Sequence, residues 1–268
     1  MNATSLPIAL TVAGSDSGGG AGIQADLKTF HRFHVFGTSA ITAITAQNTL
    51  GVAAVHPIPV EIVRAQIDAV VQDLPPVALK SGMLATTPLV EELASAIRKH
   101  GLRNYVLDPV MVASSGDRLL DESAESAVGS ELVPVATLVT PNFHEAEILV
   151  GSPVRTLREM RTAARRLVEM GATAALVKGG HGEEDEVVDV LWDGTELREW
   201  RRPRIRTRHV HGTGCTLSAA AAAGLARELP VPEAVDQAIR FVAAAIREAP
   251  GLGRGHGPVN HFAGADAR

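Results

Sequence analysis

Short apolar runs alternate with longer stretches of helical spacing along most of the chain. The runs are rich in Val, Ile, Leu and Ala and are bounded by Gly, Pro or Asp, as is typical of buried strands. Strands alternating with helices in this way indicate an α/β fold with a central, mostly parallel sheet and helices on both faces. The pattern predicts strands over residues 8–13, 39–46, 77–80, 105–107, 137–139 and 174–177, and helices over residues 24–33, 60–71, 88–99 and 157–169.

The second half of the chain adds an antiparallel element to this pattern. Residues 187–192 and 197–200 flank Asp193-Gly194, a dipeptide typical of tight turns, which predicts a small hairpin. Helices are expected over residues 215–226 and 234–247, and the Gly- and His-rich end from residue 251 is expected to form a loop or tail. Without an internal repeat, a linker or a shift in composition, we expect one domain over residues 1–268.

Composition narrows the classes of partner. Lys and Arg number 25 against 30 Asp and Glu, a net charge of -5, and aromatic residues make up 3%, so platforms for stacking nucleic-acid bases are scarce. The single cysteine excludes an internal disulfide and suits a reducing compartment. No apolar run is long enough for a signal peptide or a membrane span. We therefore expect a cytoplasmic protein that binds neither nucleic acid nor membrane.

A glycine-rich segment follows the first predicted strand. Residues 14–22 read Gly-Ser-Asp-Ser-Gly-Gly-Gly-Ala-Gly and lead into a predicted helix, where backbone amides can approach an anion. No Lys-Ser/Thr follows, so the segment is not a P-loop. Ile23 stands where a dinucleotide fingerprint needs its last glycine, which argues against a dinucleotide-dependent oxidoreductase. The alternative interpretation, a glycine-rich turn that binds no ligand, remains open.

A second glycine motif is more specific. Residues 211–216 read His-Gly-Thr-Gly-Cys-Thr directly before an Ala-rich helix, which predicts an anion hole built from the amides of Gly212, Thr213 and Gly214. Cys215 falls in the first turn, where the helix dipole would lower its pKa and allow the sulfur to act as a base toward a substrate hydroxyl. A small buried cysteine without a chemical role is the alternative.

Polar residues after three predicted strands are candidates for metal and phosphate binding. Asp108 before Pro109, and Glu145 three residues after Asn142, could hold Mg²⁺ through their carboxylates. A turn at Asp108 and a capping box formed by Asn142 and Glu145 explain the same residues without a metal. Lys178 ends a strand and could neutralise phosphate oxygens, although a solvated lysine is common at such a position.

Together and in order, these segments resemble the hydroxymethylpyrimidine and phosphomethylpyrimidine kinases of thiamine biosynthesis, members of the ribokinase superfamily. The resemblance runs nearly end to end. It implies a ribokinase-like fold, ATP and Mg²⁺ as cofactors, phosphorylation of 4-amino-5-hydroxymethyl-2-methylpyrimidine and then of its monophosphate, and a homodimer. It is carried by residues 12–28, 45–49, 80–84, 108–111, 115–117, 140–142, 178–181 and 211–216.

The resemblance also assigns roles to residues. In similar enzymes the residue at Gln47 hydrogen-bonds the aminopyrimidine ring, and an amide suits a ring that presents donors and acceptors. The other implied pocket residues are Gly14, Asp26, Met83, Val110 and Cys215. The implied metal ligands are Asp108 and Glu145, and the implied nucleotide contacts are Lys178, Thr213 and Asn142, with Gly212 to Cys215 as the anion hole.

One departure from the family pattern and two alternatives stand beside this assignment. The family commonly has Asn-Thr where this chain has His209-Val210, which removes two polar groups near the nucleotide side. A pyridoxal or pyridoxine kinase is the nearest alternative, because that ring also carries a hydroxymethyl group. A non-catalytic ligand sensor on the same fold is the other, and the retained Asp108, Glu145 and Lys178 argue against it.

Overall fold

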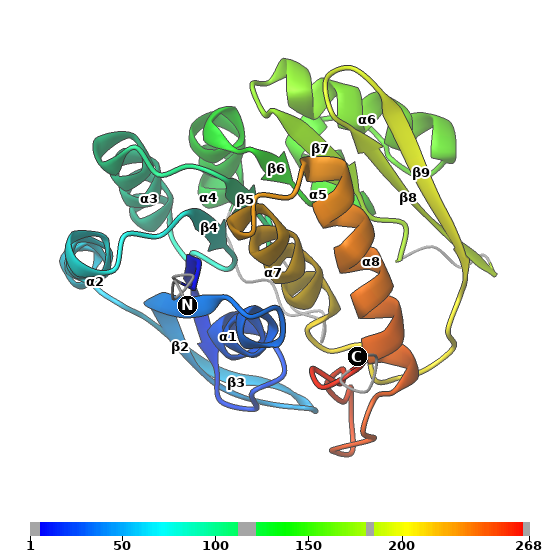
Figure 1. The fold of residues 1–268 in the computed structure, drawn as a ribbon, viewed down its shortest axis with the longest axis horizontal. Helices are drawn as coiled ribbons and strands as arrows, with labels where there is room; N and C mark the ends of the chain where they lie inside the picture. The colour runs from blue at the N-terminus through cyan, green and yellow to red at the C-terminus, as the bar shows by residue number, and fades with distance from the viewer. Residues whose placement is uncertain (1–5, 112–121, 181–184, 265–268) are drawn as a thin grey trace, which may run out of the picture.

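A mixed sheet runs through the whole computed structural model, which describes residues 6–111, 122–180 and 185–264 (Figure 1). Within these residues the sheet has nine strands in the order β3-β2-β1-β4-β5-β6-β7-β8-β9. The neighbours from β2 to β7 run parallel, and β3, β8 and β9 are antiparallel to the strands they pair with. The strands are β1 (Ile8–Asp16), β2 (Phe36–Asn48), β3 (Gly51–Pro57), β4 (Ala78–Ser81), β5 (Tyr105–Leu107), β6 (Leu138–Val139), β7 (Ala174–Val177), β8 (Glu186–Trp192) and β9 (Leu197–Pro203).

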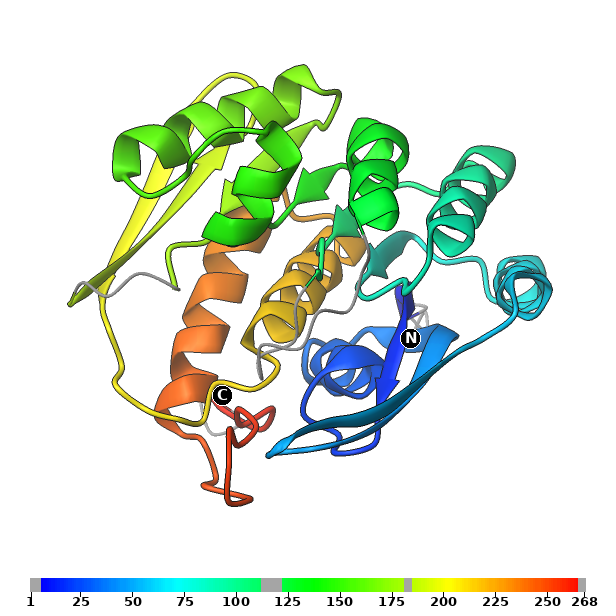
Figure 2. The same cartoon turned by 180° about the vertical axis from the view of Figure 1, so that it is seen from behind.

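Helices cover both faces of the sheet, as the sequence predicted. In Figure 1, α1 (Gly22–Arg32), α7 (Thr213–Ala226) and α8 (Val231–Arg247) lie in front of it. Figure 2, seen from behind, shows the other layer. That layer contains α2 (Val60–Asp73), α3 (Thr87–His100), α4 (Glu122–Ala127), α5 (Phe143–Val150) and α6 (Leu157–Glu169), with a π turn (Val128–Leu132) and a 3₁₀ turn (Val133–Val135) after α4.

Two apolar cores hold these layers together, because successive residues of a strand point to opposite faces. On β1, Ala9 packs toward α7 and α8, whereas Leu10 and Val12 pack toward α2 and α3. Thr11 therefore points to the same face as Ala9. The same alternation places Ala78 of β4 in the core under α7 and Leu79 in the opposite core.

Most predicted elements are confirmed, and two regions differ. Helix α6 and strands β5 and β7 have the predicted bounds. β3 was not predicted: its residues are small or exposed, and it is held by antiparallel pairing with β2 rather than by burial. The run of short helical turns over residues 122–135 was also not predicted. The motif residues 115–117 and His181 lie outside the described residues.

The segment after residue 251 is irregular, as expected, but part of it is fixed to the body of the protein. Val259, His261 and Ala263 are buried, and Pro258 forms a β-bridge with His211 at the start of the anion-hole motif. The end of the chain therefore supports the loop before α7. No described helix is long and apolar enough to cross a membrane.

Candidate active site

Three charged side chains meet at the carboxyl edge of the sheet. Lys178 Nζ lies 3.0 Å from Asp108 Oδ1 and 4.0 Å from Glu145 Oε2, and all three residues are buried. Asp108 follows β5, Glu145 follows β6 in the first turn of α5, and Lys178 follows β7. Because β5, β6 and β7 are parallel neighbours, residues that follow them meet at one edge of the sheet.

The predicted capping box is present, and it coexists with a place in the charged cluster. The Asn142 side chain accepts from the Glu145 backbone N–H at 3.0 Å, while Glu145 Oε2 accepts from the Asn142 backbone N–H at 2.7 Å. The cap holds the Glu145 carboxylate beside Lys178. The two interpretations of Asn142 and Glu145 therefore do not compete: the cap positions the carboxylate.

Burial shapes the ionisation of this cluster. Desolvation raises the pKa of Glu145 to about 7, and the charge of Asp108 adds to the increase while Lys178 opposes it. For Lys178, burial lowers the pKa, but the charges of Asp108 and Glu145 outweigh it and the net direction is upward. Lys178 therefore stays an ammonium, available to neutralise an anion.

Helix α7 begins beside this cluster. Its N-cap is Gly212, whose φ of 80° is in the left-handed region that glycine favours, and a Cβ there would overlap the Gly20 carbonyl oxygen. A Cβ on Gly214 would lie 3.3 Å from Lys178 Nζ. The backbone amides at the helix start thus lie next to the ammonium, as an anion hole for a phosphoryl group requires.

Cys215 is the third residue of α7 and is half-buried. The Gly22 backbone N–H, at the start of α1, acts to lower the pKa of its thiol. Nevertheless burial raises the pKa of the Cys215 thiol to about 11, and the opposing effect of Lys80 only partly offsets this. The expectation that a helix start would lower this pKa is wrong, because desolvation outweighs the favourable dipole.

The two glycine motifs are joined by a buried histidine–aspartate contact. Asp16 Oδ2 accepts from the Gly20 and Ala21 backbone amides, and His211 Nε2 lies 2.8 Å from the same oxygen. Burial alone would raise the pKa of Asp16, but the contacts with His211 and the loop amides lower it overall. The Asp16 carboxylate therefore fixes the first loop against the residue that precedes the anion hole.

The predicted ring-binding residues lie around these loops. Gln47 ends β2, and its Nε2 is 3.5 Å from His211 Nε2. The end of the flexible Met83 side chain lies against Gly14 and would have to shift to admit a Cβ there. Half-buried Val110 donates its backbone N–H to the Asp108 carbonyl.

Two predicted residues already have partners. The Thr213 hydroxyl donates to the Val210 carbonyl, and Asp26 is wholly buried. Its Oδ2 accepts from Thr11 Oγ1 at 2.6 Å and from Lys80 Nζ at 2.9 Å. Asp26 therefore lies beneath the pocket, bound to two protein groups.

Sequence reasoning missed four residues of this site: Thr11, Asp16, Lys80 and His211. Asp16, Lys80 and His211 stand inside quoted motifs, but their partners are distant in sequence and depend on which elements are neighbours. A lysine within a short buried strand was the available signal, since unpaired buried lysines are rare.

Asp108 and Glu145 fit a magnesium ion. Carboxylate oxygens are ligands that Mg²⁺ prefers, and the ion usually takes only one or two from the protein and the rest from phosphates and water. Within the described ranges, no group of three or more His, Cys, Asp or Glu side chains could form an all-protein metal cage. The pair therefore suits a metal that arrives with a nucleotide rather than a resident structural ion.

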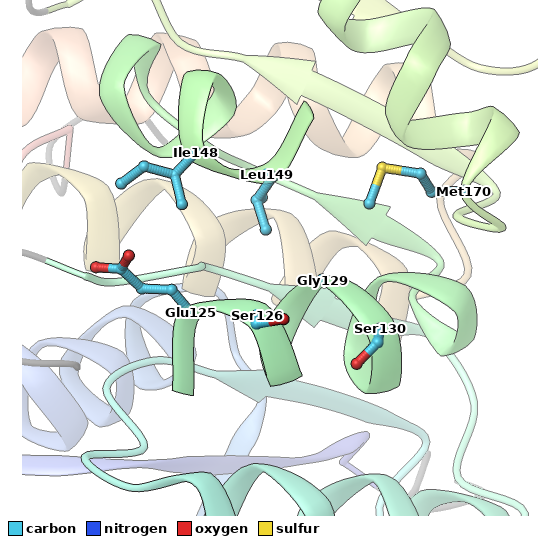
Figure 3. A pocket seen from close by; sticks show the side chains of 7 residues that line it. All are labelled: Glu125, Ser126, Gly129, Ser130, Ile148, Leu149 and Met170. Atoms are coloured by element: carbon cyan, nitrogen blue, oxygen red, sulfur yellow. The ribbon is translucent and has the colours of Figure 1, made fainter. Parts of the chain in front are cut away.

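A separate pocket lies between the α4 region and α5. Figure 3 shows Ile148 and Leu149 of α5 facing the turns after α4 across this pocket. None of the predicted site residues lines it. Its other lining residues are Glu125, Ser126, Gly129, Ser130 and Met170.

Comparison with known proteins gives the family. The sequence model of the phosphomethylpyrimidine kinase family matches residues 16–260. Hydroxymethylpyrimidine/phosphomethylpyrimidine kinase of Bacillus subtilis (strain 168) is 49% identical over 256 residues, which cover 95% of this chain and 94% of that protein. The thiamine biosynthesis bifunctional protein ThiED of Geobacter sulfurreducens is 48% identical over 96% of this chain and 52% of that longer protein.

A solved structure agrees with this comparison. The crystal structure of an ADP complex of Bacillus subtilis pyridoxal kinase matches with a TM-score of 0.90 and 39% identity, covering 97% of this chain and 98% of that one. The predicted ribokinase-like fold class is thereby confirmed. The chain belongs to the phosphomethylpyrimidine kinase family and is a small-molecule kinase.

Proposed function

We propose that this kinase transfers the terminal phosphoryl group of ATP to the hydroxymethyl oxygen of 4-amino-5-hydroxymethyl-2-methylpyrimidine, and then phosphorylates the monophosphate, in thiamine biosynthesis. One observation carries the proposal. The ammonium of Lys178 and the amides that open α7 at Gly214 lie side by side at the carboxyl edge of the sheet. A phosphoryl group in transfer needs such fixed positive charge and donors.

In this reaction Lys178, Thr213 and Asn142 contact the nucleotide. The amides of Gly212, Thr213 and Gly214 stabilise the charge that develops on the transferring group, although the Thr213 amide also donates to the Val210 carbonyl at 3.2 Å. Most of the rate enhancement comes from this positioning and charge neutralisation. Cys215, in its thiolate form, receives the proton of the substrate hydroxyl.

Asp108 and Glu145 would hold Mg²⁺. When bound, the ion neutralises phosphate charge and orients the phosphate chain. Lys178, whose Nζ lies 3.0 Å from Asp108 Oδ1 and 4.0 Å from Glu145 Oε2, would be placed beside that ion to neutralise phosphate oxygens.

The ring pocket is formed by Gln47, Gly14, Met83 and Val110, with Asp26 below it. The amide of Gln47 can donate to and accept from an aminopyrimidine. Its contact with His211 would connect ring binding to the loop that precedes the anion hole.

A second candidate substrate is pyridoxal, and the structural match to a pyridoxal kinase favours keeping it. Both rings carry a hydroxymethyl group, so the phosphate side of the site does not distinguish them. The discrimination must come from the ring contacts.

A direct assay separates these possibilities. Purified protein is incubated with ATP, magnesium and either hydroxymethylpyrimidine or pyridoxal, and products are resolved by mass. We expect the pyrimidine monophosphate and diphosphate to form with a specificity constant higher than that for pyridoxal. The opposite preference would make the chain a pyridoxal kinase, and no product from either ring would favour a ligand sensor.

The ring contact is tested with Gln47→Ala. We expect weaker binding of hydroxymethylpyrimidine by about 1–3 kcal/mol, the usual cost of leaving a polar partner unpaired, with ATP affinity kept. Ligand titration calorimetry measures both. Asn48→Ala, at the neighbouring exposed position of β2, is the matched control. Unchanged pyrimidine affinity in Gln47→Ala would refute the assignment.

Proton acceptance is tested with Cys215→Ala. We expect turnover to fall by about 10²–10⁴-fold, the usual contribution of a positioned base, with KM for both substrates little changed. Steady-state kinetics measures this. Wild-type turnover in Cys215→Ala would remove the cysteine from the reaction and leave the transfer to the anion hole and the metal.

We also propose a single domain, a cytoplasmic location and a homodimer. The continuous sheet supports the single domain, and the single cysteine agrees with the cytoplasmic location.

For the homodimer, strands β2 and β3 and the turn between them leave Ile44, Leu50 and Val55 exposed, and this is the surface we propose for a second copy of the chain. Sedimentation of the wild type against Val55→Asp tests it: a monomer in both would contradict the dimer.

A further inference from the structure

The main chain around Lys178 is held on both sides, although only its side chain takes part in the reaction described above. On one side, its N–H donates to the Pro141 carbonyl at 2.8 Å, and the residue forms a β-bridge with Asn142. On the other side, Gly179 lies so close to β8 that a Cβ would overlap the Val188 carbonyl oxygen. The backbone that carries the ammonium is therefore fixed between the segment after β6 and strand β8.

The contact with β8 includes a buried carboxylate, Asp189. The pairing of β7 with β8 ends at Val177 and Val190, so Asp189 is the first residue of β8 opposite the chain that leaves β7. Its Oδ1 accepts from the Gly179 backbone N–H at 2.8 Å, and only 1% of the residue is exposed. The side chain therefore continues the hydrogen bonding of the sheet at the point where Lys178 follows the strand.

The second oxygen of this carboxylate has a charged partner. Arg202 of β9 pairs in register with Val187, two residues before Asp189, so the side chains of all three lie on one face of the hairpin. The Arg202 guanidinium donates to Asp189 Oδ2. Two residues further along, Arg204 donates from Nη1 to the Gly180 carbonyl at 2.7 Å. Both arginines therefore support the segment after β7, one through the carboxylate and the other directly.

An ion pair that only joined β8 to β9 would not need to be buried. On the same hairpin, Arg201 and Glu186 form an ion pair in which about half of each side chain is exposed. Burying a carboxylate costs desolvation that a single arginine seldom returns, and an apolar pair of similar volume is often as stable. An apolar pair cannot supply an acceptor for the Gly179 N–H. The buried charge is therefore explained by the segment that it holds.

We propose that Asp189 is a positioning residue of phosphoryl transfer: by accepting from the Gly179 N–H, it fixes the backbone from which the Lys178 ammonium reaches the phosphates. Arg202 neutralises the carboxylate and holds it in place. The inference rests on the proposed role of Lys178 as a phosphate contact, and Asp189 acts through that residue rather than on the substrates. A lysine stem is flexible, so a fixed backbone is needed to keep its charge beside the amides of α7.

The test removes the acceptor without leaving a buried charge. In Asp189→Leu/Arg202→Met both partners become apolar. Asp189→Asn/Arg202→Gln also removes both charges, but it keeps an oxygen that can accept from Gly179. Steady-state kinetics gives turnover and KM, and urea denaturation gives stability. Calorimetry gives the affinity for the β,γ-methylene analogue of ATP, a readout that does not depend on turnover.

We expect the apolar double variant to be about as stable as wild type and to lose function. Its affinity for the ATP analogue should fall by about tenfold, the size of one weakened hydrogen bond to a charged group. Its turnover should fall by about 10- to 10²-fold, because the ammonium is misplaced. Affinity for hydroxymethylpyrimidine should stay within about twofold, since the ring contacts are made by other residues.

The amide double variant should recover turnover to within about threefold of wild type, because the acceptor for Gly179 is restored. Glu199→Gln is the matched control: Glu199 also forms an ion pair from this hairpin, but with Arg161 of α6. It should leave turnover and analogue affinity unchanged. A folded apolar double variant with wild-type turnover and analogue affinity would overturn the proposal.

A double-mutant cycle separates positioning from general damage to the fold. In the Lys178→Met background, the apolar substitutions should have little further effect on analogue affinity, because the charge that they misplace is already absent. An equal loss in both backgrounds would mean that Asp189 does not act through Lys178, and the proposal would fall. If the apolar double variant does not fold, Asp189→Ala, which removes the acceptor alone, enters the same cycle.

These outcomes are distinguishable from failure of the proposed function. If Lys178→Met keeps wild-type turnover and analogue affinity, Lys178 is not a phosphate contact, and both its role and that of Asp189 fall. If Lys178→Met is impaired while the apolar double variant behaves like wild type, Lys178 keeps its role and only that of Asp189 falls.

Discussion

Two lysine–aspartate pairs lie close together in this kinase, and they differ in burial. Lys80 and Asp26 are 2.9 Å apart, and Lys178 and Asp108 are 3.0 Å apart. The first pair is wholly sealed, whereas 11% of the Lys178 side chain is exposed. The same chemistry at the same distance therefore occurs in two settings, one closed to ligands and one open to them.

The open pair has further partners. Glu145 lies 4.0 Å from Lys178, and Ser218 donates to Asp108 Oδ2 at 3.3 Å. A phosphate or metal can enter such a cluster because each charge has a substitute partner. The sealed pair has no such freedom, so it can act only as a fixed charge. Accessibility, rather than residue type, decides which pair can bind and which can only influence its neighbours.

The largest expected effect is a loss of stability when the sealed pair, Lys80 and Asp26, loses one of its charges. Asp26→Asn leaves the Lys80 ammonium buried without a counter-charge, and we expect the free energy of unfolding to fall by about 3–5 kcal/mol. Urea denaturation measures it. The Asp26→Asn/Lys80→Met protein should recover most of the loss. A single variant as stable as wild type would mean that the pair is not sealed.

For the open pair, Lys178 and Asp108, we expect a substitution to affect turnover more than stability. Asp108→Asn leaves Lys178 with Glu145 as counter-charge, so we expect a smaller loss of stability than in Asp26→Asn. Because Asp108 is placed to hold the metal and orient Lys178, turnover should fall by about 10²–10³-fold. Kinetics and urea denaturation of the same preparation test both halves. Unimpaired turnover together with a large loss of stability would reverse the assignment of the two pairs.

The titration of His261, which lies in the C-terminal segment and contacts α7, sharpens the comparison, because it should affect stability and leave both pairs unchanged. Burial lowers the pKa of His261 to about 4, and its Nε2 lies 3.1 Å from Thr216 Oγ1. The unfolded chain binds the proton first as pH falls, so stability present above about pH 6.5 is lost toward pH 4.

Between about pH 7.5 and pH 5 the expected contribution of His261 is about 2 kcal/mol. Urea denaturation at both values should show this loss in the wild type and a smaller one in His261→Asn, whose amide can still bond Thr216. At neutral pH the variant should keep its turnover. An identical pH dependence in the two proteins would show that His261 does not carry this loss.

The sequence predicted the outline of the fold because the buried strands have a strong pattern. Tyr105–Leu107 and Ala174–Val177 are short, apolar and bounded by polar residues, and both were placed to the residue. Gly51–Pro57 has no such pattern, since its position depends on hydrogen bonds to β2 and not on a buried face. The position of an edge strand of this kind is determined by its hydrogen bonds to the neighbouring strand, which the sequence of the edge strand does not reveal.

Site residues that belong to a contiguous sequence motif could be predicted. Site residues that are brought together only by tertiary packing could not. The Gly212–Cys215 segment and Lys178 were found in advance, and the structure places them together. Lys80 was not recognised as a site residue, because its place opposite Asp26 depends on the pairing of β1 with β4 and on the helix above them. The pKa of Cys215 was mispredicted for the same reason: the depth of burial is a tertiary property.

The contact between the two glycine loops has a consequence for engineering this enzyme. Gly212 has no room for a side chain because the Gly20 carbonyl lies against it, and His211 is fixed to Asp16. Variation introduced on the ring side of the site would therefore be transmitted to the phosphate side. Libraries intended to change the accepted vitamin precursor should spare both loops and diversify ring-side positions outside them, such as Val110, instead.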